Sequence, residues 1–219
     1  MFNYEEMKNK IILADCMDIM KDIPDKWFEL AIVDPPYGGD DAINLKDNIN
    51  QSLQATQRTV YKQFDNIEPS EEYWKELFRI TKNQIVWGCN FYTKINLHGG
   101  RLVWDKKGTA FGRAEEAYLS MTKSVNIFEY TWNGMIQENM KDKEIRIHPT
   151  QKPIALYRWL LQNYAKPGDK IIDTHSGSGS LACACHLEKF DFLAIEKDED
   201  YYKASVERLE TLRSQGVLF

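Results

Sequence analysis

The sequence predicts an α/β fold built on a Rossmann-like, doubly wound and mostly parallel sheet. Short apolar segments typical of buried strands alternate with helical segments along the chain. Several of these strands end at an acidic residue or a glycine-rich turn, where open α/β sheets bind their ligands. Because there is no internal repeat and no linker, we expect residues 1–219 to form one domain.

The N-terminal half contains three apolar segments that predict strands, at residues 11–13, 29–33 and 84–87. The first two segments lead to Asp15 and Asp34. Because strand ends of a parallel sheet lie at one edge, these carboxylates are expected near a ligand site.

A long connection separates the second and third predicted strands. Residues 39–66 are polar and rich in Asn, Gln and Asp, and we expect a mobile loop there. Ser70 then begins a helix, because its hydroxyl can cap the first turn and two glutamates follow it.

The C-terminal half alternates strands with helices in the same way. Pro153 suits the first turn of a helix, and a Pro-Gly-Asp turn follows that helix. The expected strands are residues 102–104, 117–121, 127–132, 170–173 and 192–195, and the expected helices are residues 153–164, 180–188 and 198–213.

The composition of the chain bears on whether it can bind a membrane or a nucleic acid. The 219 residues have a net charge of −5 and 43% hydrophobic residues, and no apolar run approaches the roughly 20 residues of a membrane span. The N-terminus lacks a signal-peptide core, so we expect a cytoplasmic protein. A nucleic-acid partner would need a local basic surface. Residues 101–152 carry nine Lys/Arg against seven Asp/Glu, a small local excess of two.

The four cysteines are Cys16, Cys89, Cys183 and Cys185, and their spacing is not that of a disulfide framework. Cys183, Cys185 and His186 lie in an apolar stretch with no second ligand pair at finger-like spacing, which favours helix packing over a metal site. No metal is predicted.

Residues 171–180 read I-I-D-T-H-S-G-S-G-S, a strand followed by a glycine-rich turn and a helix. Gly177 and Gly179 would let the backbone approach a ligand, and Glu196 at the end of the next strand could accept hydrogen bonds from ribose hydroxyls. The spacing fits neither a triphosphate loop nor a dinucleotide loop. The pattern favours a nucleoside cofactor such as S-adenosylmethionine over a simple tight turn.

The run Asp34-Pro35-Pro36-Tyr37 follows a buried strand. Two prolines remove two N–H donors, which leaves the Asp34 carboxylate and the Pro35 carbonyl as acceptors for an exocyclic amino group. Tyr37 offers a flat face on which an extruded base can stack. A rigid turn with a capping aspartate is the alternative, and the full D-P-P-Y pattern favours catalysis.

These motifs resemble those of the DNA amino-methyltransferases. D-P-P-Y is similar to the family's catalytic motif, D-T-H-S-G-S-G-S to its methionine-binding motif, and residues 148–153 match its H-P-T-Q-K-P signature. The motif order is the beta arrangement, a permuted form of the S-adenosylmethionine-dependent methyltransferase fold. The resemblance extends from about residue 10 to 210, and residues 84–106 look like small phage-type members. Such a protein would work in a bacterial or phage-infected cell. Two positions depart from the family pattern, His175 in place of Phe and Ala14 in place of Gly.

The resemblance implies a role for each motif. Asp34, Pro35 and Pro36 would form the corner that holds the target amino group, with Tyr37 stacked on the base. The residues implied at the cofactor are Asp15 and Cys16 at its adenine, Glu196 at its ribose, and Thr150, Lys152, Asp173, His175, Ser176, Gly177 and Gly179 around its methionine part.

Double-stranded DNA is the implied substrate, and two segments are candidates to contact it. Residues 39–66 form the expected DNA-facing loop, and residues 105–114 form a basic turn. An ordinary surface loop and an ordinary hairpin remain the alternatives. Little of the chain is left for a separate recognition domain, so target recognition is modest, short-sited or shared between two copies in a homodimer. The candidate DNA-binding residues are Arg58, Tyr61, Lys62, Lys106, Lys107 and Arg113.

N6 of adenine is the expected methyl acceptor, because family members specific for N4 of cytosine more often begin their motif with Ser. Glutamine methyltransferases usually have Asn at position 34, and carbon-5 cytosine methylation would need a nucleophilic cysteine in a Pro-Cys turn. RNA methylation and a non-catalytic role in binding nucleic acid are further hypotheses. The amino-methyltransferase hypothesis requires Asp34 and Pro35 to face the pocket formed by residues 174–179.

Overall fold

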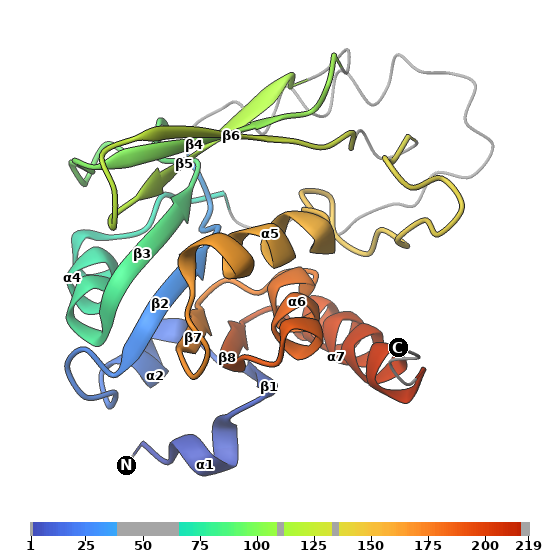
Figure 1. Cartoon of the computed structure of the whole chain (residues 1–219). Coiled ribbons are helices and arrows are strands. Elements are labelled where there is room, and N and C mark those ends of the chain that lie inside the picture. The colour runs from blue at the N-terminus through green and yellow to red at the C-terminus, as the bar shows by residue number, and fades with distance from the viewer. Residues whose placement is uncertain (1, 39–65, 109–111, 133–135, 216–219) are drawn as a thin grey trace.

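The computed structural model describes residues 2–38, 66–108, 112–132 and 136–215. Within them, eight strands form one sheet in the order β1-β8-β7-β2-β3-β5-β4-β6 (Figure 1). β5 pairs antiparallel with β3 and β4, and the remaining pairs are parallel, which confirms the predicted sheet. The strands are β1 (Lys10–Leu13), β2 (Phe28–Val33), β3 (Thr81–Trp87), β4 (Gly100–Asp105), β5 (Ala114–Leu119), β6 (Val125–Glu129), β7 (Lys170–Asp173) and β8 (Asp191–Glu196).

The helices begin at polar caps where the sequence supplies them. The Ser70 side chain accepts a hydrogen bond from the Tyr73 N–H, and the Asp198 side chain accepts from two N–H groups of the last helix. No helix of the described residues is long and apolar enough to cross a membrane. The helices are α1 (Tyr4–Met7), α2 (Cys16–Met20), α4 (Glu71–Ile80), α5 (Ile154–Tyr164), α6 (Ser180–Glu188) and α7 (Glu199–Ser214).

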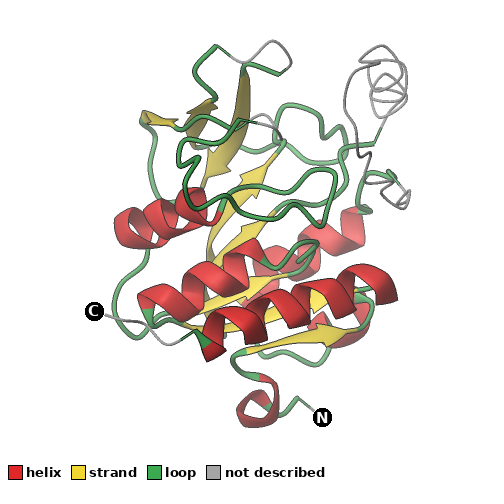
Figure 2. Cartoon of the chain, turned by 90° about the vertical axis from the view of Figure 1, so that its right-hand side faces the viewer, coloured by secondary structure: helices red, strands yellow, loops and turns green. Residues whose placement is uncertain are grey.

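Helices cover both faces of the sheet (Figure 2). Alternate residues of β2 point to opposite faces, as strand geometry requires. Leu30 and Ile32 pack in one apolar cluster with side chains of α5, α6 and α7, whereas Ala31 and Val33 pack in a second cluster with side chains of α2 and α4. This two-sided burial makes the fold doubly wound.

The switch point of the sheet lies between β2 and β7, which pair in parallel through Leu30↔Ile171 and Ala31↔Ile172. From β2 the chain continues through α4 to β3, and from β7 it continues through α6 to β8 on the other side. The two connections therefore diverge, which opens a crevice at the carboxyl ends of β2 and β7.

The bounds of two strands, β5 and β6, differ from the sequence-based expectation. β5 covers 114–119 rather than 117–121, because the ladder with β4 continues to Ala114 through two polar residues that the apolar pattern did not mark. β6 covers 125–129 rather than 127–132, since its pairing with β4 ends at Glu129. The short helices α1 and α2 also carried no apolar repeat that would have predicted them.

Candidate active site

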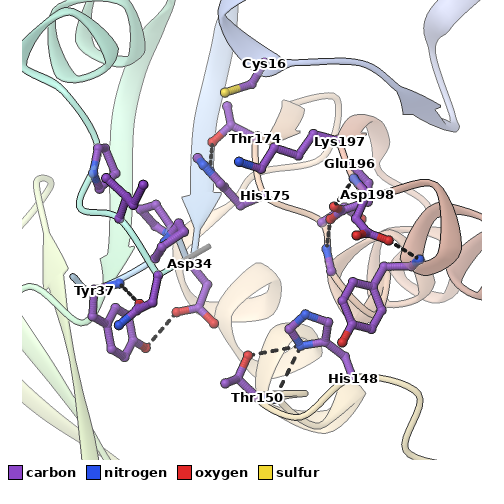
Figure 3. A pocket seen from close by; sticks show the side chains of 18 of the residues that line it. Cys16, Asp34, Tyr37, His148, Thr150, Thr174, His175, Glu196, Lys197 and Asp198 are labelled. Carbon is purple, nitrogen blue, oxygen red and sulfur yellow. Dashed lines mark hydrogen bonds between the residues drawn. The ribbon is translucent and has the colours of Figure 1, made fainter. Parts of the chain in front are cut away.

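A cavity of about 890 Å³ lies where β1, β2, β7 and β8 end (Figure 3). Asp34 and Pro35 line it together with Thr174, His175 and the following residues of the glycine-rich turn, so the spatial requirement of the sequence hypothesis is met. The sequence-predicted residues in its wall are Asp15, Cys16, Asp34, Pro35, Pro36, Tyr37, Thr150, Lys152, His175, Ser176, Gly177 and Glu196.

Two predicted cofactor residues, Asp173 and Gly179, lie outside the cavity wall. The Asp173 side chain is buried and accepts a hydrogen bond from the His175 N–H. Gly179 precedes α6 at φ 69°, and a Cβ there would lie 3.1 Å from Ile11 and from Ser205. Both residues therefore contribute to the structure of the glycine-rich turn and do not face the cavity.

Glu196 holds the glycine-rich turn in place. One of its carboxylate oxygens accepts the Gly177 N–H at 2.7 Å, and the other accepts the Asp198 N–H at 2.9 Å. Burial raises the pKa of Glu196 above its ordinary value, although these N–H groups oppose the shift. The carboxylate lies in the cavity wall with lone pairs left for further donors.

The protonation of Asp173 is set by its surroundings. Burial raises its pKa to about 8, the His175 N–H opposes this, and the negative charges of Asp34 and Glu196 add to it. A carboxyl group beneath the turn therefore retains its proton near neutral pH.

The two acceptors of the D-P-P-Y corner already receive hydrogen bonds from protein donors. The Tyr37 hydroxyl donates to Asp34 Oδ1 at 2.8 Å, and the Lys152 ammonium donates to Asp34 Oδ2 at 2.5 Å. The Tyr92 hydroxyl lies 2.9 Å from the Pro35 carbonyl oxygen. Because a carbonyl or carboxylate oxygen has two lone pairs, each can accept a further donor.

Lys152 was expected beside the cofactor's methionine, and it lines the same cavity, but its ammonium points to the D-P-P-Y corner. It contacts Asp34 and also lies 3.0 Å from Glu115, with its side chain 2% exposed. Burial would lower the pKa of Lys152, but the two carboxylates outweigh burial and raise it above its usual value. Lys152 is therefore a buried ammonium held between two carboxylates.

Comparison with known proteins shows similarity to DNA methylases. A family model of DNA methylases, of the N6/N4 methyltransferase kind, matches residues 103–207. Type II methyltransferase M.HinfI of Haemophilus influenzae is 23% identical over 96% of this chain and 71% of its own length. M.HpaI of Haemophilus parainfluenzae is 23% identical over 94% of this chain and 75% of its own length. These matches support a member of the DNA amino-methyltransferase family.

Two solved structures share the fold of this chain. A putative DNA modification methylase from Thermus thermophilus, solved with S-adenosyl-L-methionine, gives a TM-score of 0.55 at 14% identity over 93% of this chain and 95% of its own. The cytosine-N4-specific PvuII DNA methyltransferase gives 0.56 at 13% identity over 94% and 91%. The S-adenosylmethionine-dependent methyltransferase fold predicted from the motif order is thus confirmed.

Tyr37 is enclosed on two sides. Its ring stacks on Phe91 with 4.9 Å between centroids and 11° between planes. On Gly88, which has φ 69°, a Cβ would lie 2.1 Å from a ring carbon of Tyr37. A base that stacks on Tyr37 must therefore displace Phe91 or bind beside it.

His175, one of the two departures from the family pattern, is hydrogen-bonded to Thr174. The Thr174 hydroxyl lies 3.0 Å from His175 Nδ1 and 2.7 Å from the Tyr73 hydroxyl, and the Tyr73 ring meets the imidazole edge-on. Burial lowers the pKa of His175 to about 3, so the ring is neutral at physiological pH. A neutral imidazole therefore lines the cavity at this position.

The sequence hypothesis missed several residues around the D-P-P-Y corner. Phe91 and Tyr92 lie in the N-F-Y run after β3, which was noted only as part of a phage-type segment. Tyr73 of α4 and Tyr157 of α5 line the cavity from helices. Glu115 gave no signal, because it precedes the apolar part of its strand.

The candidate DNA-binding residues lie away from the cavity wall where they are described. Lys106 pairs with Glu115, Lys107 lies 3.0 Å from Glu138, and Arg113 is exposed. The other three, Arg58, Tyr61 and Lys62, and most of the expected loop at 39–66 lie outside the described residues. Their contact with DNA remains a prediction.

Cys183 and Cys185 pack in the apolar core along α6, as the helix-packing interpretation expected. Among the described residues no group of three or more His, Cys, Asp or Glu side chains is placed to hold a metal ion.

Proposed function

We propose that this methylase transfers a methyl group from S-adenosylmethionine to N6 of a flipped-out adenine in double-stranded DNA. Similarity to the DNA methylases supports the coarser part of this proposal, methyl transfer to DNA. The observation that carries the proposal is that the Asp34 carboxylate and the Pro35 carbonyl share one cavity with the turn at residues 174–178.

The cavity fits the cofactor in size and in chemistry. About 890 Å³ is within the range of small-molecule pockets and leaves room for a nucleoside with a base beside it. The Ser176 hydroxyl is buried in this wall and has no hydrogen-bond partner among the described residues. Because buried hydroxyls rarely remain unpaired, this one supports a polar ligand at the turn. Glu196 would hold the ribose, and Asp15 and Cys16 would meet the adenine.

S-adenosylmethionine, when bound, supplies a methyl group that its sulfonium has already activated. The protein has to orient the amino group and stabilise the charge that develops on it. Asp34 and the Pro35 carbonyl accept the two N–H bonds of the amino group, which directs the nitrogen lone pair away from them. Methyl transfer to this nitrogen would break the methyl–sulfur bond and leave S-adenosylhomocysteine, and Asp34 or solvent would take one proton from the nitrogen.

Asp34 supports adenine over cytosine as the target. The carboxylate carries a full charge where the amino nitrogen becomes positive, and the resemblance associates an aspartate at this position with adenine. Double-stranded DNA requires extrusion of the base, since the stack hides its amino group. We propose that the enzyme acts in the cytoplasm, where it would meet DNA.

The direct test is transfer of a tritiated methyl group to unmethylated phage DNA, followed by nucleoside analysis. N6-methyl-2′-deoxyadenosine supports the proposal. Detection of N4-methylcytosine would mean that the target base is cytosine instead of adenine, and the rest of the proposed mechanism would stand. Absence of label in DNA, in a protein that binds the cofactor, would contradict the DNA substrate and direct attention to RNA, protein or a binding role.

A further inference from the structure

Glu115 of β5 lies next to the D-P-P-Y corner without belonging to any motif. Its Oε2 is 3.0 Å from the ammonium of Lys152, and that ammonium is 2.5 Å from Asp34 Oδ2 and 3.3 Å from the Tyr37 hydroxyl. The three N–H donors of Lys152 therefore face three oxygens, of which Glu115 supplies the one most remote from the target site.

The Lys152 side chain is only 2% exposed, so water cannot take the place of a missing acceptor. Its ammonium also lies 5.2 Å from the centre of the Trp87 ring, which closes another side. A buried ammonium must satisfy its charge with protein groups. Its position therefore depends on the carboxylates on both sides of it.

Glu115 is itself anchored from the opposite side. Lys106 pairs with its other oxygen, Oε1, at the end of β4. Burial would raise the pKa of Glu115, but Lys152 and Lys106 outweigh burial and lower it to about 2. Glu115 is thus a fixed negative charge at physiological pH.

The arrangement affects the acceptor that the reaction needs. If Lys152 had Asp34 as its sole carboxylate, it could turn onto both Asp34 oxygens and neutralise the charge that a methylated amino nitrogen requires. With Glu115 present, the ammonium is drawn to one oxygen of Asp34, and Oδ1 remains toward Tyr37 and the cavity. Two carboxylates around one ammonium also leave negative charge beside the target site.

We propose that Glu115 is a positioning residue for methyl transfer, which acts through Lys152 to keep one oxygen of Asp34 available to the target amino group. This inference rests on the proposed function, since it assigns Glu115 a part in the same reaction. It predicts that Glu115 affects the transfer step without affecting the binding of cofactor or DNA.

The test compares Glu115→Gln with Glu116→Gln. Glu116 is the next residue on β5 and pairs with Arg101 at 2.8 Å, so its variant removes a charge and an ion pair from the same strand. Single-turnover transfer of a tritiated methyl group to DNA gives the rate constant. Calorimetry with S-adenosylhomocysteine and fluorescence anisotropy with labelled DNA give the two dissociation constants.

We expect Glu115→Gln to lower the transfer rate constant about tenfold or more, with both dissociation constants within about twofold of wild type. Glu116→Gln should keep all three values. Glu115→Asp, which keeps the carboxylate on a shorter side chain, should recover part of the rate and provides the comparison if Glu115→Gln does not fold.

The inference is overturned if Glu115→Gln matches Glu116→Gln in rate, or if it weakens cofactor binding as much as it slows transfer. It is also overturned if Glu115→Asp is as slow as Glu115→Gln. Wild-type protein that transfers no methyl group to DNA would contradict the proposed function instead, so the two failures are distinguishable.

Discussion

The ammonium of Lys152 and the carboxylate of Asp34 form an ion pair of 2.5 Å in the wall of the cavity, across 118 residues of sequence. This contact joins the H-P-T-Q-K-P segment to the D-P-P-Y corner. In the proposed reaction, the orientation of Asp34 would be fixed by a partner from another motif, as preorganised catalytic groups require.

Replacement of Lys152 by methionine should destabilise the protein and stop methyl transfer. Asp34 and Glu115 would face each other across an apolar side chain with no shared cation. Breaking a buried pair by removing one partner costs about 3–5 kcal/mol, and the partial exposure of both carboxylates places the expected loss of unfolding free energy near the lower figure. Denaturant titration measures it, and an unchanged midpoint would argue that the ion pair is weak.

Tyr37→Ala and Tyr37→Phe separate the ring of Tyr37 from its hydroxyl. Base stacking contributes about 1–3 kcal/mol, so loss of the ring should lower transfer about tenfold to a hundredfold. Tyr37→Phe keeps the stack on Phe91 and loses the hydrogen bond to Asp34, and its rate should fall less than about tenfold. Transfer assays and 2-aminopurine fluorescence at the target position measure both effects. Equal losses in the two variants would contradict a stacking role.

Gly88→Ala and Gly108→Ala form a matched pair, because both glycines have positive φ values, 69° and 74°. A Cβ on Gly88 would lie 2.1 Å from the Tyr37 ring, whereas a Cβ on Gly108 would meet no atom of the described residues within 4 Å. Both variants carry backbone strain, and overpacking should cost Gly88→Ala about 1–3 kcal/mol more in unfolding free energy. Similar thermal midpoints for the two variants would show that the Tyr37 ring moves aside without loss of stability.

Asp173 predicts a pH dependence of stability. Its pKa is about 8 in the folded protein and about 4 when unfolded, so the folded state holds a proton that the unfolded state releases. Its contribution to stability is fully present below the unfolded pKa and is lost as pH rises to about 8. Between about pH 5 and about pH 9, the free energy of unfolding should therefore fall less in Asp173→Asn than in wild type. Thermal unfolding at both pH values tests this, and parallel losses would contradict the raised pKa.

The residues that could be predicted from the sequence are those whose position follows from strand ends. Asp34 and Glu196 end apolar strands of a parallel sheet, and Ser176 lies in a glycine-rich turn, so topology alone brings them to one cavity. The bounds of β5 were predicted less well, since Ala114 and the polar residues Glu115 and Glu116 pair with β4 without apolar alternation.

The partners of these residues could not be predicted in the same way. Glu115 reaches Lys152 because β5 pairs antiparallel with β3 and β4, a pairing that no local pattern encodes. Tyr92 bonds to the Pro35 carbonyl across 57 residues. Such contacts depend on how strands and helices pack together, and a sequence motif does not specify that packing.

The central claim is that Asp34 acts on the target amino group and has no part in holding the cofactor. Asp34→Ala, measured for single-turnover methyl transfer to DNA and for S-adenosylhomocysteine binding by calorimetry, tests this claim most directly. The account predicts loss of transfer with a cofactor dissociation constant close to that of wild type. Loss of both in equal measure, or transfer that persists without the carboxylate, would contradict it.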